Sequence, residues 1–138
     1  MDYRQLTAPC GLDCFNCAVY RAREDDTLRA TVAQRLGIPP ERAVCPGCRA
    51  AKGAPRHLGE RGPCRVWRCI SAKGHEFCFE CDEFPCDALH PYADKAAERP
   101  HNTKVFNLCL IKRLGVERWA QEKAAQVRQT YYQKKFEI

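Results

Sequence analysis

The stretch PCGLDCFNCAVY, residues 9–20, places Cys10, Cys14 and Cys17 within eight residues. Cysteines this close together form disulfides, act as reactive thiols or hold a metal ion. The first residues, MDYRQLTAPCG, lack the basic and then apolar pattern of a signal peptide, and no stretch approaches the roughly 18 apolar residues of a membrane span. We therefore expect a cytoplasmic protein, in which disulfides rarely persist and clustered cysteines favour metal binding.

Cysteine accounts for 11 of the 138 residues, and such a high share is typical of a scaffold built around cysteine. The hydrophobic fraction of 45% includes these cysteines, so the remaining apolar core is thin. A chain of this length fits one domain. We expect a single domain over residues 1–138, with a cysteine-rich metal-binding part at 1–90 and a helical part at 91–138.

The formal net charge of +6 counts every cysteine as neutral. Metal ligands are thiolates, however, and four of them around one divalent ion carry a net charge of −2. Two such sites reduce the total to +2. The basic excess is therefore only partly available to an anionic partner.

Two helices are predicted in the cysteine-rich part. The segment DDTLRATVAQRLG, residues 25–37, has apolar residues at helical spacing, with Asp26 as a cap and Gly37 as a stop. The segment PCRVWRCISAK, residues 63–73, begins with a proline that suits a first helical turn and is followed by Gly74.

The C-terminal part shows two longer apolar periodicities. HNTKVFNLCLIKRLG, residues 101–115, and VERWAQEKAAQVRQTYY, residues 116–132, are separated by a single glycine, which favours an antiparallel helix pair. The sequence thus predicts a small, metal-stabilised, mainly α fold. Cys-x-x-Cys zinc knuckles and loops form its N-terminal two thirds, and the helix pair forms its C-terminus.

Three Cys-x-x-Cys pairs carry the metal prediction: Cys14/Cys17, Cys45/Cys48 and Cys78/Cys81. Two intervening residues let the backbone fold into a knuckle that directs both sulfurs at one ion, while turn amides stabilise the thiolates. The predicted ligands are Cys10, Cys14, Cys17, Cys45, Cys48, Cys64, Cys69, Cys78, Cys81 and Cys86. We expect Cys109, on the apolar face of a helix, to be a buried hydrophobic residue instead.

Zinc prefers four ligands, so ten cysteines provide two sites with two thiols left over. The spare thiols can support or bridge the sites, or a third site can recruit His57 and His75. Four thiolates also accept iron, which leaves an iron–sulfur cluster as an alternative to zinc. We find no Ser/His/Asp set, phosphate-binding glycine loop or zinc-plus-glutamate signature, and this argues against an enzyme.

Basic residues flank an aromatic side chain in the segment CRAAKGAPRHLGERGPCRVWR, residues 48–68. Such a combination can hold a nucleic-acid backbone and stack a base on Trp67. Charges solvated around anionic metal sites are the simpler explanation. The basic residues concerned are Arg49, Lys52, Arg56, Arg61, Arg65 and Arg68.

Four segments taken in order resemble a known family: CGLDCFNCAVY, CPGC, CRVWRCISAKGHEFCFECDEFPCDAL and NLCLIKRLGVERWAQE. They are similar to the cysteine-rich prokaryotic proteins of unknown function designated DUF3795, from Cys10 to Gln121. The resemblance implies a small zinc-binding protein without an assigned activity, and it supports the ten cysteines as family positions. The family pattern has another cysteine shortly before Cys64, where this chain has Arg61.

These observations favour a metal-binding protein in which two zinc ions replace a missing core. We expect it to act as a binding or adaptor module for another protein. The alternatives are an iron–sulfur protein for electron transfer or redox sensing, and a zinc-stabilised nucleic-acid-binding protein. No segment indicates a membrane partner.

Overall fold

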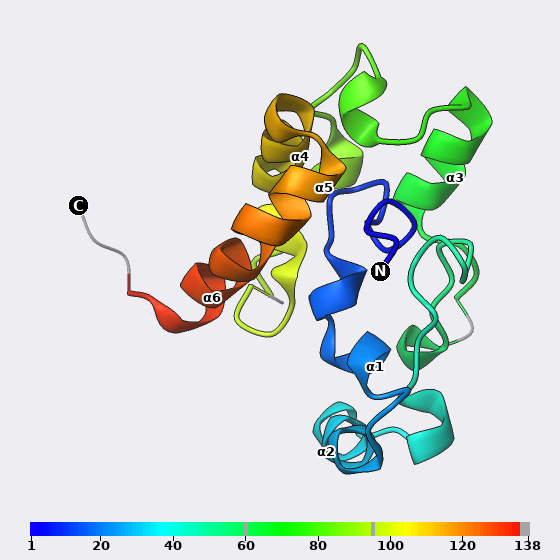
Figure 1. The fold of residues 1–138 in the computed structure, drawn as a ribbon. Coiled ribbons are helices and arrows are strands. Elements are labelled where there is room, and N and C mark those ends of the chain that lie inside the picture. Colours follow the sequence, from blue (N-terminus) through cyan, green and yellow to red (C-terminus); the bar gives the residue numbers. More distant parts are fainter. Residues whose placement is uncertain (60, 95, 136–138) are drawn as a thin grey trace.

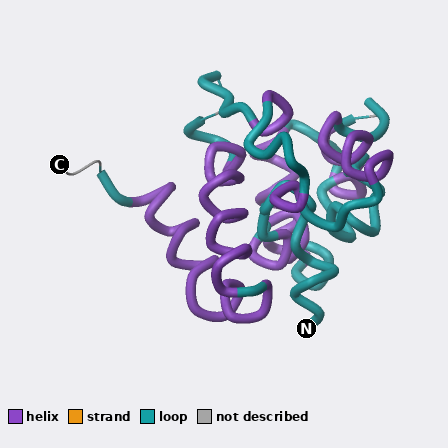
Figure 2. The backbone as a smooth tube through the Cα atoms, turned by 90° about the horizontal axis from the view of Figure 1, so that it is seen from above, coloured by secondary structure: helices purple, strands orange, loops and turns teal. Residues whose placement is uncertain are grey.

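The computed structural model describes residues 1–59, 61–94 and 96–135, and over these residues the protein is mainly helical. The described residues form no strand, and their only extended pairing is an isolated bridge between Thr7 and Asp13. Helices alternate with long loops throughout the N-terminal half (Figure 2). No helix in these segments has the length and apolar character that a membrane span requires.

Helices α1 (Ala18–Arg21) and α2 (Asp26–Leu36) follow the first three cysteines. Asp25 caps α2 by accepting a hydrogen bond of 2.8 Å from the Leu28 amide, and Gly37 ends it in the left-handed conformation. The predicted helix is confirmed, but its cap is Asp25 and not Asp26. An N-terminal cap accepts from the amide three residues later, which Asp25 does here.

Helix α3 (Arg65–Lys73) is capped at its start by Cys64, whose sulfur accepts from the Trp67 amide at 3.4 Å, and at its end by Gly74 with φ +69°. Both ends agree with the sequence prediction within two residues. Among the described residues, short 3₁₀ turns make up much of the remaining N-terminal structure: η1 (Cys14–Asn16), η2 (Pro40–Arg42), η3 (Arg56–Leu58), η4 (Cys78–Glu80) and η5 (Asp87–Leu89). A further 3₁₀ turn, η6 (Pro100–Thr103), directly precedes the C-terminal helices.

The C-terminal part contains α4 (Lys104–Leu114), α5 (Val116–Trp119) and α6 (Ala125–Gln133). Residues Ala120–Ala124 between α5 and α6 form a π-helical turn, η7, which the sequence did not reveal. In Figure 1 the N-terminal segment runs between α3 on one side and α4 to α6 on the other, while α2 lies at the lower end.

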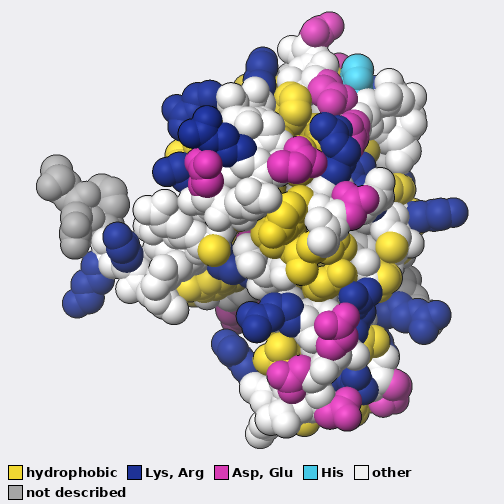
Figure 3. All heavy atoms as spheres, viewed as in Figure 1, with side chains coloured by type: hydrophobic (Ala, Val, Ile, Leu, Met, Phe, Trp, Pro, Cys, Tyr) yellow, Lys and Arg dark blue, Asp and Glu magenta, His cyan; other side chains and the backbone are white. Residues whose placement is uncertain are grey.

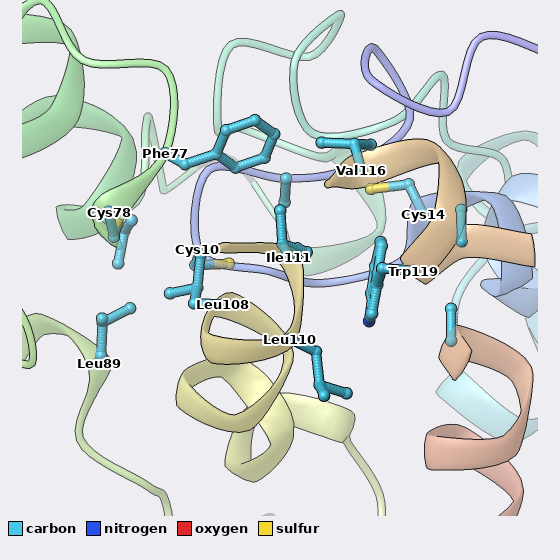
Figure 4. Close-up of a cluster of buried hydrophobic side chains, with 14 of the residues drawn as sticks. Cys10, Cys14, Phe77, Cys78, Leu89, Leu108, Leu110, Ile111, Val116 and Trp119 are labelled. Atoms are coloured by element: carbon cyan, nitrogen blue, oxygen red, sulfur yellow. The ribbon is translucent and has the colours of Figure 1, made fainter. Parts of the chain in front are cut away.

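The main core includes thiols as well as apolar side chains (Figure 4). Trp119, Phe77 and Leu108 are almost completely buried in it, together with Cys10 and Cys14. The C-terminal helices therefore pack directly on the first cysteines. A second cluster lies around α2 and consists of Val19, Val32, Ala33, Ala43 and Cys45.

Cys109 is exposed, contrary to the prediction that it is buried. Helix α4 turns Asn107, Leu108 and Ile111 inward. Successive helical residues are rotated by about 100°, so the position after Leu108 faces outward. Phe106 is exposed as well.

Two polar contacts fix the first cysteine segment, residues 10–17, to the C-terminal helices. Asn107 donates a buried hydrogen bond of 2.9 Å to the Gly11 carbonyl. A Cβ atom at Gly11, where φ is +85°, would lie 2.9 Å from the Lys104 carbonyl, so glycine is required for this approach. Arg128 binds the buried Asp13 carboxylate through two bonds, of 2.6 and 3.0 Å.

The Asp13–Arg128 ion pair predicts a large mutational effect. The Arg128→Met substitution leaves the Asp13 carboxylate buried without its partner. We therefore expect the free energy of unfolding to fall by about 3 kcal/mol. The exposed pair between Arg118 and Glu122 is the matched control, and Arg118→Met should cost less than about 1 kcal/mol. Urea unfolding measures both values.

The double variant Asp13→Asn/Arg128→Met should regain part of the stability, because it removes the unpaired charge. Equal stability of Arg128→Met and Arg118→Met would contradict this account of the ion pair.

Candidate metal centre

Eight of the ten predicted ligands line two cavities. We call Cys14, Cys17, Cys45 and Cys48 the first cysteine set, because all four line one wide cleft. We call Cys69, Cys78, Cys81 and Cys86 the second cysteine set, because all four line one small cavity. Each set contains residues that are distant in sequence, and all eleven cysteines of the structure are free thiols.

The first set joins the Cys14/Cys17 pair to the Cys45/Cys48 pair. The Cys48 amide donates to the Cys14 sulfur at 3.4 Å, and the Cys45 amide donates to the Val19 carbonyl at 3.1 Å. These contacts place the Cys45/Cys48 pair against η1 and α1.

The thiols of the first set interact electrostatically. Hydrogen bonds from the Cys48 side chain and amide lower the pKa of Cys14 to about 7, because they stabilise its thiolate. The same contact raises the pKa of Cys48. Burial raises the pKa of Cys45 to about 11, and negative charge on Cys14 and Cys17 adds to the shift. This group therefore favours one negative charge and resists several, unless a cation is bound between the sulfurs.

The second set surrounds a cavity of about 20 Å³ with apolar walls from Val66 and Ile70 of α3. Burial raises the pKa of Cys78 to about 12, and the neighbouring thiols Cys10, Cys86, Cys69 and Cys81 raise it further. Mutual repulsion of this kind is what a divalent cation relieves.

A lysine supports the second set from the surface. Lys73 donates to the Cys81 sulfur at 3.1 Å and forms an ion pair of 2.9 Å with Glu83. Both contacts raise the pKa of Lys73, the bond to Glu83 contributing most. The lysine therefore supplies positive charge to a sulfur of this set.

The donor chemistry of both sets suits a soft or borderline metal, since thiolates select zinc, iron–sulfur clusters and copper(I). In the parts of the chain that the structure describes, however, no three His, Cys, Asp or Glu side chains form a group arranged to hold a metal ion. The sulfurs share cavities without adopting a coordination shell.

Cys10 and Cys64 lie outside both sets. Cys10 is buried, which raises its pKa to about 11, and its charge interacts with those of Cys14 and Cys64. Cys64 is exposed at the start of α3. His57 lines the cleft of the first set together with His101, whereas His75 follows the end of α3. The cavities therefore do not bring the predicted pair His57 and His75 together.

One member of the basic cluster has a structural role. Arg49 donates to the Thr7 carbonyl at 2.8 Å and the Glu76 carbonyl at 3.0 Å, and its guanidinium lies 4.8 Å from the centre of the Phe77 ring. The exposed basic residues of the cluster are Lys52, Arg56, Arg61, Arg65 and Arg68. On the face seen in Figure 3, basic and acidic side chains are interspersed.

Three supporting side chains had no signal in the sequence. Asp13 and Arg128 are 115 positions apart, and Lys73 meets Cys81 because both side chains line the cavity of the second set. No short motif connects such positions.

The fold and the cavities define a cysteine-rich, mainly helical protein whose thiols gather in two sets of four. A family model described as "Protein of unknown function (DUF3795)" matches residues 6–91. The chain belongs to this family, and the matched region contains all ten predicted ligands. No curated protein and no solved structure shows significant similarity to it.

The lysine contact predicts an effect on metal affinity. Lys73→Met removes a donor to the Cys81 sulfur, and we expect zinc affinity of the second set to fall about tenfold, as for other groups that contact metal ligands. The control is Lys112→Met, which alters an exposed lysine on α4. Competition with a chromophoric chelator measures both affinities, and equal values for the two variants would contradict a role for Lys73.

Proposed function

We propose that this protein is a small metal-binding scaffold that holds two structural zinc ions, one in each cysteine set, and presents a binding surface to a protein partner. The observation that carries the proposal is the grouping of eight cysteines, from distant parts of the chain, around two cavities. Four thiolates would close each site, and closed four-coordinate sites are typical of structural zinc.

Zinc would compensate for the thin apolar core. Binding at a structural site supplies on the order of 10 kcal/mol, which is comparable with the whole stability of a small domain. In this proposal the three Cys-x-x-Cys segments act as zinc knuckles, and the C-terminal helices form an antiparallel pair that braces them. A reducing compartment such as the cytoplasm belongs to the same proposal, since it keeps the thiols free.

Elemental analysis tests the proposal directly. Protein purified without oxygen should contain about two zinc ions per chain and show no visible absorbance. Iron with acid-labile sulfide would contradict the zinc proposal and show instead an iron–sulfur protein for electron transfer or redox sensing. Absence of any bound metal would refute both.

Serine variants test the assignment of the two sets. Cys48→Ser and Cys81→Ser should each lose about one metal ion and become less soluble, because three thiolates bind more weakly than four. Cys109→Ser changes an exposed thiol outside both sets and should keep about two ions. A soluble, fully metallated Cys48→Ser protein would show that Cys48 is not a ligand.

A further inference from the structure

The first cysteine set opens onto a cleft of about 680 Å³, far larger than the cavity of about 20 Å³ at the second set. Its walls come from α1, α2, η3, α6 and residues 97–101. A volume of this size is in the range of small-molecule pockets, which are roughly 300–1,000 Å³. A structural metal site alone gives no reason for such a cleft.

Two histidines in the cleft have unsatisfied nitrogen atoms. The Nδ1 atoms of His57 and His101 are shielded from solvent and have no hydrogen-bond partner among the described residues. Buried polar atoms without partners are uncommon, and one explanation is that they bind a ligand. Burial lowers the pKa of both rings to about 4, so both are neutral near pH 7 and each carries one N–H donor.

The cleft also contains arginines. Arg99 lies near both imidazoles, since its positive charge helps to lower both pKa values. Arg128 lines the cleft too, but its charge is neutralised by the buried Asp13. Arg35 of α2 lines the cleft as well. Arg99 is the lining arginine whose charge acts on both imidazoles, so it is the one best placed to act with the two histidines.

The lining also includes the charged side chains of Arg35 and Glu98, and most of its remaining surface is apolar. Val19 of α1, Val32 and Leu36 of α2 and Leu58 of η3 provide hydrocarbon surface. A few convergent polar groups in an otherwise apolar cleft are the usual features of a site for a small organic molecule. Arginine and imidazole N–H groups recognise carboxylate and phosphate oxygens.

We propose that the cleft binds a small organic oxyanion, whose carboxylate or phosphate group is held by His57, His101 and Arg99 and whose apolar body packs on α1 and α2. This site goes beyond the proposed metal scaffold, because none of its three polar residues is a cysteine of either set. The ligand would lie beside the first cysteine set, so its binding would be sensitive to metal binding there.

NMR titration of histidine-labelled protein, purified without oxygen and with its metal content unaltered, tests the proposal with phenyl phosphate, phenylacetate and neutral benzyl alcohol. At least one oxyanion should shift the His57 and His101 signals and bind about tenfold more tightly than benzyl alcohol. Preference for phenyl phosphate identifies an organic phosphate, and preference for phenylacetate identifies a carboxylate.

Arg99→Gln and His57→Gln should each weaken that binding about tenfold, because the first removes a positive charge and the second removes the imidazole N–H that would contact the charged oxygen. Arg65→Gln and His75→Gln, which lie outside the cleft, are the matched controls and should bind normally. Equal binding by Arg99→Gln and the wild type, equal binding of benzyl alcohol, or no saturation with either oxyanion would overturn the proposal.

Zinc content is measured on the same samples. Full zinc content without oxyanion binding would reject the cleft proposal alone. Oxyanion binding by a chain that takes up no zinc would reject the metal scaffold and support the cleft.

Discussion

The contact between Cys14 and Cys48 is the constraint around which the N-terminal half is arranged. These residues are 34 positions apart, and the Cys48 amide reaches the Cys14 sulfur. The intervening chain forms α1, α2 and the second apolar cluster, so this cluster lies within a loop closed by the two Cys-x-x-Cys pairs. Closing such a loop costs conformational entropy, and a cation shared by the two pairs would offset that cost in the way a cross-link does.

Because the thiols lie close together, ionising one of them disfavours ionising its neighbours, and a bound metal ion would remove this repulsion. Burial places the pKa of Cys10, Cys45 and Cys78 at about 11, 11 and 12, so these thiols are protonated near pH 7 in the absence of a cation. Nearby positive charges offset only part of the free energy that is needed to ionise these buried thiols. Lys73 contacts one sulfur of the second set, and the charge of Arg128 favours the Cys14 thiolate although Asp13 counteracts it. In the proposed function, a divalent ion at each set would supply the missing charge at the sulfurs themselves.

Local structure could be predicted from the sequence because its signals are local. Gly37 and Gly74 end their helices as expected, and the Cys-x-x-Cys spacing identified thiols that share cavities. The division into two sets depends on tertiary packing, and no spacing rule contains it. The Asp13–Arg128 pair joins residues 115 positions apart, and the exposure of Cys109 depends on which face of α4 meets the core. Sequence periodicity identified the helix but not the orientation of each side chain.

The family match covers only part of the chain, whereas the cleft is lined by residues from inside and outside the matched region. The matched region, residues 6–91, contains both cysteine sets and His57. His101 and Arg99, by contrast, lie beyond it, as do the cleft residues Arg128 and Tyr132 of α6. The cysteine framework therefore supplies one wall of the cleft, and the C-terminal part supplies the other. Because both walls contribute polar groups, the cleft's chemistry depends on residues outside the family region, and a change there can alter ligand preference while both cysteine sets stay intact.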